Sequence, residues 1–341
     1  MVAREPLILW GGSRMLRVVV AGAGFMGATH APRWAAQEDV RVVGVYSRSL
    51  ARAAGVAEPL GAQATDDLAA LLQMDADAVD ICLPTDRHPE VACSALAAGR
   101  HVVCEKPIAL RIDDAERMAA AARAADRLLL VAHVVRFWPE YARLFELVRD
   151  GAIGRPTSAV AQRLQEGPGW AADSATTYAH TGGQVVDLQI HDDDYLMWLF
   201  GMPRQVFAQG SQRHMLTTFA FDGVTATAEA AADMPPGYPF TSTVRVRGEG
   251  GVLEYVFRAG GARPDEAGGG VSELTLHRPG RPAERVAVAP GDPYTTQIAH
   301  FAECLRRGAP STVVTPESAT RALRVALAAG ESLQSGVPVR L

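Results

Sequence analysis

The stretch RVVVAGAGFMG, residues 17–27, places a run of valines directly before three glycines in G-x-G-x-x-G spacing. Gly22, Gly24 and Gly27 allow a tight turn from a strand into a helix and let backbone N–H groups approach a pyrophosphate closely. A second valine-rich run, RVVGVYSRS, follows from Arg41, where the next strand of a dinucleotide-binding unit is expected. The stretch therefore predicts a dinucleotide-binding turn; the alternative is an ordinary strand–helix turn.

Further strand-like runs continue this pattern. AVDICLPT begins at Ala78, HVVCEKP at His101 and RLLLVAHVV at Arg127, and alanine-rich helical segments separate them. Such β-α-β alternation predicts a parallel, doubly wound sheet. One of the helical segments, IDDAERMAAAARAAD, predicts a helix with Asp113 as its N-cap.

The second half of the chain has a different pattern. From about residue 204 to about 290 it consists of short alternating runs with turn signals, such as TSTVRVRGEGGVLEYVF, which predict antiparallel sheet. The stretch GARPDEAGGG, residues 261–270, predicts a mobile loop on that sheet. A last helix is predicted over TPESATRALRVALAAGESL, with Thr315 as N-cap and Pro316 at the first helical position.

We therefore predict an α/β protein of two domains. Residues 15–134 form a Rossmann dinucleotide-binding domain, and residues 135–341 form an α/β domain with a large, mostly antiparallel open sheet. Residues 1–14 are interpreted as an N-terminal arm.

Composition narrows the class of protein. The chain has 341 residues, 48% of them hydrophobic, and a net charge of -5, which describes a soluble globular protein without attraction to nucleic acid or anionic membrane. No apolar run approaches the ~20 residues of a membrane helix and no signal peptide is evident, so we expect a cytoplasmic location. The four cysteines show no C-x-x-C spacing, which favours buried reduced thiols over disulfides or a metal site.

Lys106, in HVVCEKPIAL, is the only lysine among 33 basic residues. An arginine is a permanently charged planar fork, whereas a lysine ammonium is compact and can share its proton. A lysine that persists in such an arginine-rich chain predicts chemistry that arginine cannot perform. The alternative is that this one lysine remained by chance.

A second candidate site lies in GGQVVDLQIHDDDYLMWLFG, residues 182–201. On a helix, Asp187 and His191 face the same direction because they are four residues apart, and Asp194 follows three residues later. A carboxylate one turn from an imidazole orients it and raises its basicity. Two alternatives are a solvated helix with incidental acids and a divalent cation site, although the spacing matches no zinc signature.

Together these elements resemble the Gfo/Idh/MocA family of nicotinamide-dependent oxidoreductases. The resemblance rests on GAGFMGATH, PTDRHPEVACSALAAGRHVVCEKP, VAHVVRFWPEY and GGQVVDLQIHDDDYLMWLFG, and spans nearly the whole chain from Met15. It implies that Lys106 donates to the reacting oxygen, Asp187 binds or polarises a neighbouring substrate hydroxyl and His191 accepts the proton. It also implies a cis Lys106–Pro107 bond and a homodimer or homotetramer in which the open sheet forms subunit contacts.

The cofactor prediction is NADP, with NAD as the alternative. Where a dinucleotide fold usually presents an acid to the ribose hydroxyls, this chain has Ser47 and Arg48, which suit a 2'-phosphate. Arg48 as a solvated surface arginine is the competing interpretation. The candidate cofactor-binding residues are Gly22, Gly24, Phe25, Met26, Gly27, Ser47, Arg48, Pro84, Thr85, His88, Glu105 and Lys106.

Arg136, Trp170 and Tyr178 are the candidate substrate residues, and a tryptophan such as Trp170 suits a sugar ring unless it only packs. No metal is predicted. The sequence thus predicts hydride transfer between nicotinamide and a secondary alcohol or ketone of a sugar or polyol. The alternatives are a dinucleotide-binding sensor without turnover and an enzyme acting on a non-sugar ketone, imine or dihydrodiol.

Overall fold

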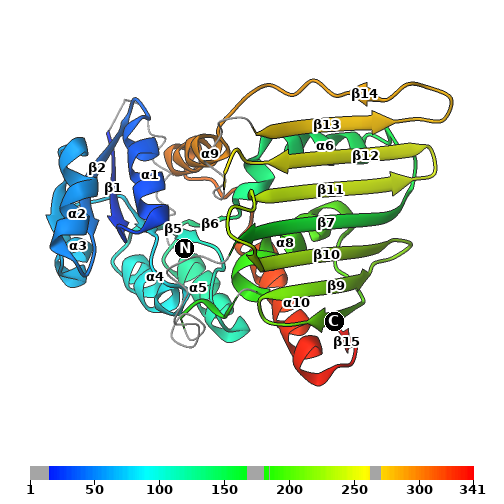
Figure 1. Cartoon of the computed structure of the whole chain (residues 1–341). Coiled ribbons are helices and arrows are strands. Elements are labelled where there is room, and N and C mark those ends of the chain that lie inside the picture. Colours follow the sequence, from blue (N-terminus) through cyan, green and yellow to red (C-terminus); the bar gives the residue numbers. More distant parts are fainter. Residues whose placement is uncertain (1–14, 167–179, 184, 262–269) are drawn as a thin grey trace, which may run out of the picture.

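The computed structural model describes residues 15–166, 180–183, 185–261 and 270–341. Its first half is built on a six-stranded sheet in the order β3-β2-β1-β4-β5-β6 (Figure 1). The strands are β1 (Leu16–Ala21), β2 (Val40–Tyr46), β3 (Gln63–Thr65), β4 (Ala78–Ile81), β5 (His101–Glu105) and β6 (Leu129–Ala132). All pairings are parallel, so the doubly wound prediction is confirmed.

Helices connect these strands. They are α1 (Phe25–Ala35), α2 (Leu50–Ala57), α3 (Leu68–Gln73), α4 (His88–Ala97) and α5 (Ile112–Ala124), with short 3-10 turns η1 (Glu58–Leu60) and η2 (Thr85–Arg87). The valines of β1 are fully buried, as expected for a parallel sheet covered on both faces. The N-cap prediction for Asp113 is wrong, because Arg111 is the cap residue and Asp113 lies in the first turn, where a carboxylate favours the helix dipole.

The glycine turn between β1 and α1 has strict steric limits. Gly22 has a φ of +126°, and a Cβ there would lie 2.3 Å from the Cys82 carbonyl oxygen. A Cβ on Gly27 would lie 1.8 Å from the Gly22 carbonyl oxygen, so α1 can approach the turn only with glycine at this position. A Cβ on Gly24 would meet nothing within 4 Å. The sheet order reverses between β1 and β4, which is where open parallel sheets bind ligands.

The second half contains a nine-stranded sheet in the order β14-β13-β12-β11-β7-β10-β9-β8-β15. The strands are β7 (Pro156–Glu166), β8 (Gln205–Gly210), β9 (His214–Ala220), β10 (Thr225–Met234), β11 (Thr241–Gly248), β12 (Gly251–Arg258), β13 (Val271–His277), β14 (Glu284–Arg285) and β15 (Val339–Arg340). Only the β7–β10 pairing is parallel among these described strands, so the mostly antiparallel prediction is confirmed. The sequence analysis missed β7, which lies at the centre.

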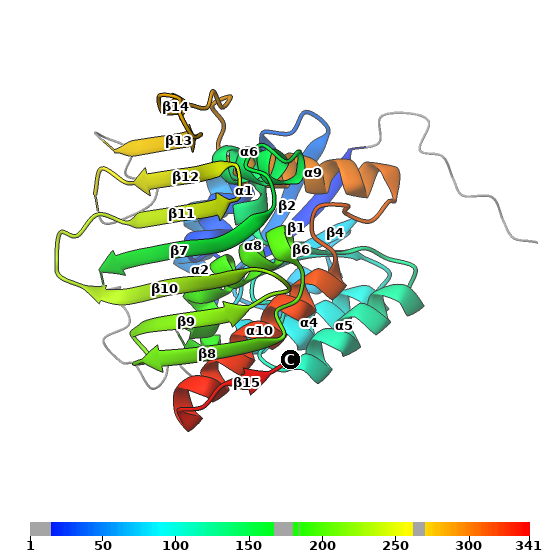
Figure 2. The same cartoon turned by 90° about the vertical axis from the view of Figure 1, so that its right-hand side faces the viewer.

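The helices of this half are α6 (Pro139–Arg149), α8 (Ile190–Phe200), α9 (Pro293–Arg307) and α10 (Pro316–Ser335), with a 3-10 turn η3 (Val134–Phe137) and a π-helical turn η5 (Val185–Gln189). α6, α8 and α10 pack against the sheet, and α9 packs against α1 and η3. Buried and exposed residues alternate along β9 and β11, which leaves one face of the sheet open (Figure 2). The last helix begins as predicted, with the Thr315 side chain accepting from the Ser318 backbone and Pro316 next to the cap.

Two further expectations can be compared with the structure. All four cysteines are free, as predicted, with Cys104 and Cys304 buried and Cys82 and Cys93 partly exposed. No helix within the described ranges is both long and apolar enough to span a membrane. Most of the predicted loop at 261–270 lies outside the described residues.

We predict that Gly27→Ala lowers the free energy of unfolding by about 1–3 kcal/mol, because the added methyl overlaps the Gly22 carbonyl. Gly55→Ala, inside α2, is the matched control. A Cβ there meets nothing within 4 Å, so the substitution raises stability by about 0.5–1 kcal/mol. Thermal denaturation followed by circular dichroism measures both effects, and equal melting temperatures for the two variants would contradict the prediction.

Candidate active site

A cavity of about 460 Å³ lies where the two halves of the chain meet. The first half contributes residues from the carboxyl ends of β1, β4 and β5, and the second half contributes residues from β7, η5 and α8. Lys106, Asp187 and His191 all line this cavity. The structure therefore brings together the three residues that the sequence singled out for chemistry.

Lys106 follows β5 and reaches across to η5. Its Nζ donates to Asp187 Oδ1 at 2.8 Å and to the Asp187 backbone oxygen at 2.6 Å, joining residues 81 apart in sequence. The lysine side chain is 14% exposed and the aspartate side chain 35%, so the pair is partly shielded from water. An ammonium has three donors, and these bonds use two of them. The Lys106–Pro107 bond is cis, as the resemblance implied.

His191 lies in the first turn of α8, four residues after Asp187. Its Nδ1 is buried and has no hydrogen-bond partner among the described residues. Burial lowers the pKa of His191 well below its ordinary 6.5, and the positive charges of Lys106 and Arg163 and the neighbouring His133 lower it further. His191 is therefore neutral near pH 7, so its ring can accept a proton. The expectation that Asp187 raises the basicity of His191 is wrong, because the Asp187 carboxylate is bound to Lys106 and the pKa of His191 is lowered.

The three consecutive aspartates after His191 are fully buried. Arg163 of β7 donates from Nε and Nη2 to the two carboxylate oxygens of Asp192, at 3.0 and 2.9 Å. The Gln189 side chain donates to Asp193 Oδ1 at 3.0 Å, and burial raises the pKa of Asp193 well above its ordinary range. The carboxylates of Asp192 and Asp194 each face an arginine, which argues against the divalent cation alternative for this segment.

Arg136 requires a correction, because it does not line the cavity. Its Nε and Nη2 donate to the Asp194 carboxylate at 2.8 and 2.6 Å, and Nη1 donates to the Val313 backbone oxygen at 2.7 Å. The guanidinium also lies over the Trp198 ring, 5.3 Å from its centroid. Each of its three nitrogens thus bonds within the fold, and the Asp194 carboxylate is bound to Arg136.

His88 also has a different place from the one expected. Both ring nitrogens lie 2.9 Å from backbone carbonyl oxygens, those of Leu83 and Pro107. Burial lowers the pKa of His88. The imidazole joins the turn before α4 to the loop after Lys106, so it positions that loop rather than contacting a ligand.

The other predicted residues fall into three groups. Gly24, Phe25, Met26, Pro84, Thr85 and Glu105 line the cavity with Lys106. Ser47 and Arg48 lie outside it, directly after the carboxyl end of β2. Trp170 and Tyr178 lie outside the described residues.

Several lining residues escaped sequence reasoning. Trp138 and Phe240 line the cavity, and both rings pack against Phe257. Their ring centroids lie 5.1 and 6.1 Å from the Phe257 centroid. Tyr294, at the start of α9, reaches the same cavity from near the end of the chain. No local pattern marks these residues, because only tertiary packing brings them to the site.

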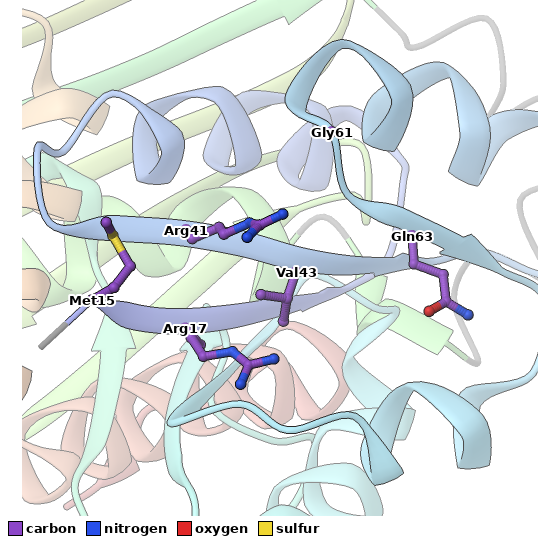
Figure 3. Close-up of a pocket in the computed structure, with 6 residues that line it drawn as sticks. All are labelled: Met15, Arg17, Arg41, Val43, Gly61 and Gln63. Atoms are coloured by element: carbon purple, nitrogen blue, oxygen red, sulfur yellow. The ribbon is translucent and has the colours of Figure 1, made fainter.

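Figure 3 shows another hollow, at the opposite end of the first sheet. It is lined by Met15, Arg17, Arg41, Val43, Gly61 and Gln63. These residues lie at or near the beginnings of β1, β2 and β3, whereas ligands of parallel sheets bind beyond the carboxyl ends. Arg17 is also paired with Asp75. We therefore assign the candidate active site to the first cavity.

Comparison with known proteins agrees with this geometry. The family model described as an oxidoreductase family with an NAD-binding Rossmann fold matches residues 16–133, and the Gfo/Idh/MocA C-terminal domain model matches residues 141–254. The chain belongs to the Gfo/Idh/MocA oxidoreductase family.

Several of the similar proteins are named as dehydrogenases of sugars or inositols. The chain is 35% identical over 196 residues to D-glucoside 3-dehydrogenase of Escherichia coli K12, an alignment that spans only 56% of each protein. It is 27% identical to scyllo-inositol 2-dehydrogenase (NAD(+)) of Bacillus subtilis over 96% of both chains.

Solved structures show the same fold. UDP-N-acetylglucosamine 3-dehydrogenase from Acidithiobacillus ferrooxidans has a TM-score of 0.78 at 25% identity, covering 94% of this chain and 98% of that one. Aldose-aldose oxidoreductase from Caulobacter crescentus has a TM-score of 0.81 at 24% identity, covering 96% and 100%.

The cavity fits the nicotinamide dinucleotide expected of a Gfo/Idh/MocA protein. The open space at Gly24 lets the backbone of the glycine turn approach a pyrophosphate at the start of α1. From there the lining continues through Pro84 and Thr85 to Glu105 and Lys106, so these residues would hold the other end of a dinucleotide bound at the glycine turn.

We predict that Arg136→Met lowers the free energy of unfolding by about 3–5 kcal/mol, because it leaves the buried Asp194 carboxylate without its partner. The double variant Arg136→Met/Asp194→Leu recovers most of the loss. Arg149→Met is the control, since Arg149 is largely exposed, and it changes stability by less than about 0.5 kcal/mol. Chemical denaturation measures these values; a stable Arg136→Met variant with only a raised KM would instead support a substrate role.

Proposed function

We propose that this protein is a nicotinamide-dependent dehydrogenase or reductase of a sugar or polyol, which moves a hydride between the nicotinamide and a secondary alcohol or its ketone. The observation that carries the proposal is the convergence of Lys106, Asp187 and His191 in a cavity that the dinucleotide-binding turn also lines. The sugar and inositol dehydrogenases among the relatives support the substrate class.

We propose a role for each of the three residues. When bound, the nicotinamide supplies the hydride chemistry. A carbinol carbon can release a hydride only as its O–H proton is lost, and the neutral His191 accepts that proton. The third donor of the Lys106 ammonium stabilises the negative charge that grows on the substrate oxygen. Asp187 fixes the ammonium and offers a carboxylate oxygen to a neighbouring hydroxyl.

The substrate half of the cavity suits a sugar or polyol ring. Trp138 and Phe240 offer aromatic faces to the C–H face of such a ring. Gln165 and Arg163 line the same space with polar groups, and Arg163 retains Nη1 without a hydrogen bond to any described residue. Apolar faces and polar edges together match a cyclic polyhydroxy compound.

We further propose the arrangement of the whole protein. The chain passes from β6 to η3 near residue 134, which supports a Rossmann domain over residues 15–134 and a substrate domain over residues 135–341. The open face of the nine-stranded sheet suits subunit contacts in a homodimer or homotetramer, and a cytoplasmic location suits the cofactor.

A turnover screen tests the proposal. The protein is incubated with NAD or NADP and a panel of sugars, inositols, sugar acids and diols, and formation of reduced nicotinamide is followed by absorbance. His191→Ala serves as the inactive control and should lower turnover by roughly 10² to 10⁴. Tight dinucleotide binding without turnover of any member would favour a non-catalytic sensor instead.

We predict that Lys106→Arg loses turnover almost as completely as Lys106→Met, by roughly 10² or more, while both variants still bind dinucleotide. A guanidinium is larger than an ammonium, cannot share its proton at neutral pH and does not fit the 2.6 and 2.8 Å contacts with Asp187 in the same way. Single-turnover kinetics and dinucleotide titration check the two statements. An active arginine variant would show that any positive charge suffices here.

We predict a preference for NADP over NAD of about tenfold to hundredfold in kcat/KM, because one charge-assisted bond from Arg48 to a 2'-phosphate contributes about 1.5–3 kcal/mol. Ser47→Asp reverses the preference by repelling the phosphate. Arg48→Gln removes it, whereas Arg41→Gln, at the other end of β2, does not. Steady-state kinetics with both cofactors decide the point, and equal efficiency in the wild-type enzyme would mean that Arg48 points away from the ribose.

A further inference from the structure

A row of three buried ionisable side chains lies beside the cavity, apart from the candidate catalytic residues. Asp80 of β4, His30 of α1 and Glu105 at the end of β5 are 0%, 0% and 5% exposed. His30 Nδ1 lies 3.0 Å from Asp80 Oδ2, and His30 Nε2 lies 3.2 Å from Glu105 Oε1. The imidazole is thus held between two carboxyl groups inside the first domain.

Both ends of the row are anchored. The Trp34 indole donates to Asp80 Oδ2 at 2.8 Å, and the Lys106 backbone N–H donates to Glu105 Oε2 at 3.2 Å. His30 Nδ1 is hydrogen-bonded to Asp80 Oδ2, whereas His30 Nε2 and Glu105 Oε1 face each other at 3.2 Å without forming a hydrogen bond. Burial alone lowers the pKa of His30, but Asp80 and Cys82 outweigh burial and raise it well above its ordinary value.

The charges in this region can be counted. The row holds two carboxylates and one imidazolium, which leaves one negative charge. Burial raises the pKa of Cys82 to about 12 and that of Tyr294 to about 12, so both neighbours are neutral at pH 7. Nearby, the Lys106 ammonium is matched by Asp187. The remaining negative charge lies at the end of the row, where Glu105 lines the cavity.

We propose that the Asp80–His30–Glu105 row places a net negative charge beside the nicotinamide site and so makes the protein bind oxidised dinucleotide more tightly, relative to reduced dinucleotide, than it otherwise would. The oxidised nicotinamide ring is cationic and the reduced ring is neutral. A fixed charge in a site shielded from water therefore acts on one form of the cofactor and not on the other. The Lys106 backbone N–H positions the Glu105 carboxylate, and the single positive charge of His30 offsets only one of the two carboxylates.

The row then influences the direction of the reaction. Selective binding of the oxidised form makes the bound reduced cofactor a stronger hydride donor. Hydride transfer from the reduced cofactor creates the cationic nicotinamide ring, which the negative charge of the row stabilises. The site is therefore biased toward reduction of a bound carbonyl compound. This inference rests on the proposed function, because it requires a nicotinamide at the Glu105 end of the cavity.

The experiment compares the dissociation constants of the oxidised and reduced dinucleotide in the absence of substrate, by calorimetry and by fluorescence of the reduced form. Glu105→Gln keeps an acceptor for the Lys106 N–H and removes the charge. We expect the ratio Kd(oxidised)/Kd(reduced) to rise about tenfold. Glu105→Ala should move the ratio in the same direction, and Glu105→Asp, which keeps the charge, should leave it within about threefold of the wild-type value.

Asp86→Asn is the matched control. Asp86 lies on η2, next to the cavity residue Thr85. Its carboxylate is 29% exposed and lies 2.6 Å from His180 Nδ1, so solvent and this partner screen it, and its loss should change the ratio less than about twofold. A purely positional role for Glu105 would weaken both forms equally and leave the ratio unchanged, which would overturn the inference while the proposed function stands. If the wild-type protein bound neither form, the proposed function would fail and the inference with it.

Discussion

Three consecutive buried carboxylates at the start of α8 impose the constraint on which the rest of the site depends. Removing an ionised carboxylate from water costs several kcal/mol unless a partner compensates it. Arg163 from β7 compensates Asp192, and Arg136 from η3 compensates Asp194. These pairs attach the start of α8 to the large sheet on one side and to the chain leaving the Rossmann sheet on the other. They thereby fix the position of Asp187 and His191.

The same arrangement determines the protonation of His191. Its imidazole is buried near the Lys106 ammonium, the Arg163 guanidinium and His133, while Asp192 and Asp194 are bound to arginines. A proton on His191 is therefore disfavoured first by burial and then by charge. Burial and these positive charges keep the proposed proton acceptor neutral, although three acids follow it on the same helix.

The sequence predicted those features that local patterns encode. Strand runs and glycine spacing were sufficient for the doubly wound sheet, and Lys106 stood out by composition alone. The four-residue spacing of Asp187 and His191 correctly indicated a shared side, although a π-helical turn, not an α-helix, carries Asp187. Arg136 was misassigned because a buried pair with Asp194 depends on contacts 58 residues apart, which no local pattern reveals. The strand β7 was missed because its polar residues, such as Gln162 and Arg163, bind partners on other elements, Glu229 of β10 and the buried Asp192 of α8.

The contrast between the arginines and the single lysine now has a structural reason. Arg136 and Arg163 each hold a buried carboxylate with two parallel bonds, a task for which the planar fork is suited. Lys106 instead holds Asp187 and, in the proposed function, also presents a donor to a reacting oxygen in the same small space. A compact ammonium, whose three donors point in different directions, can do both. A guanidinium bound to a carboxylate has all of its donors in one plane. Arginine therefore suits the frame of this site, and only its reactive centre requires lysine.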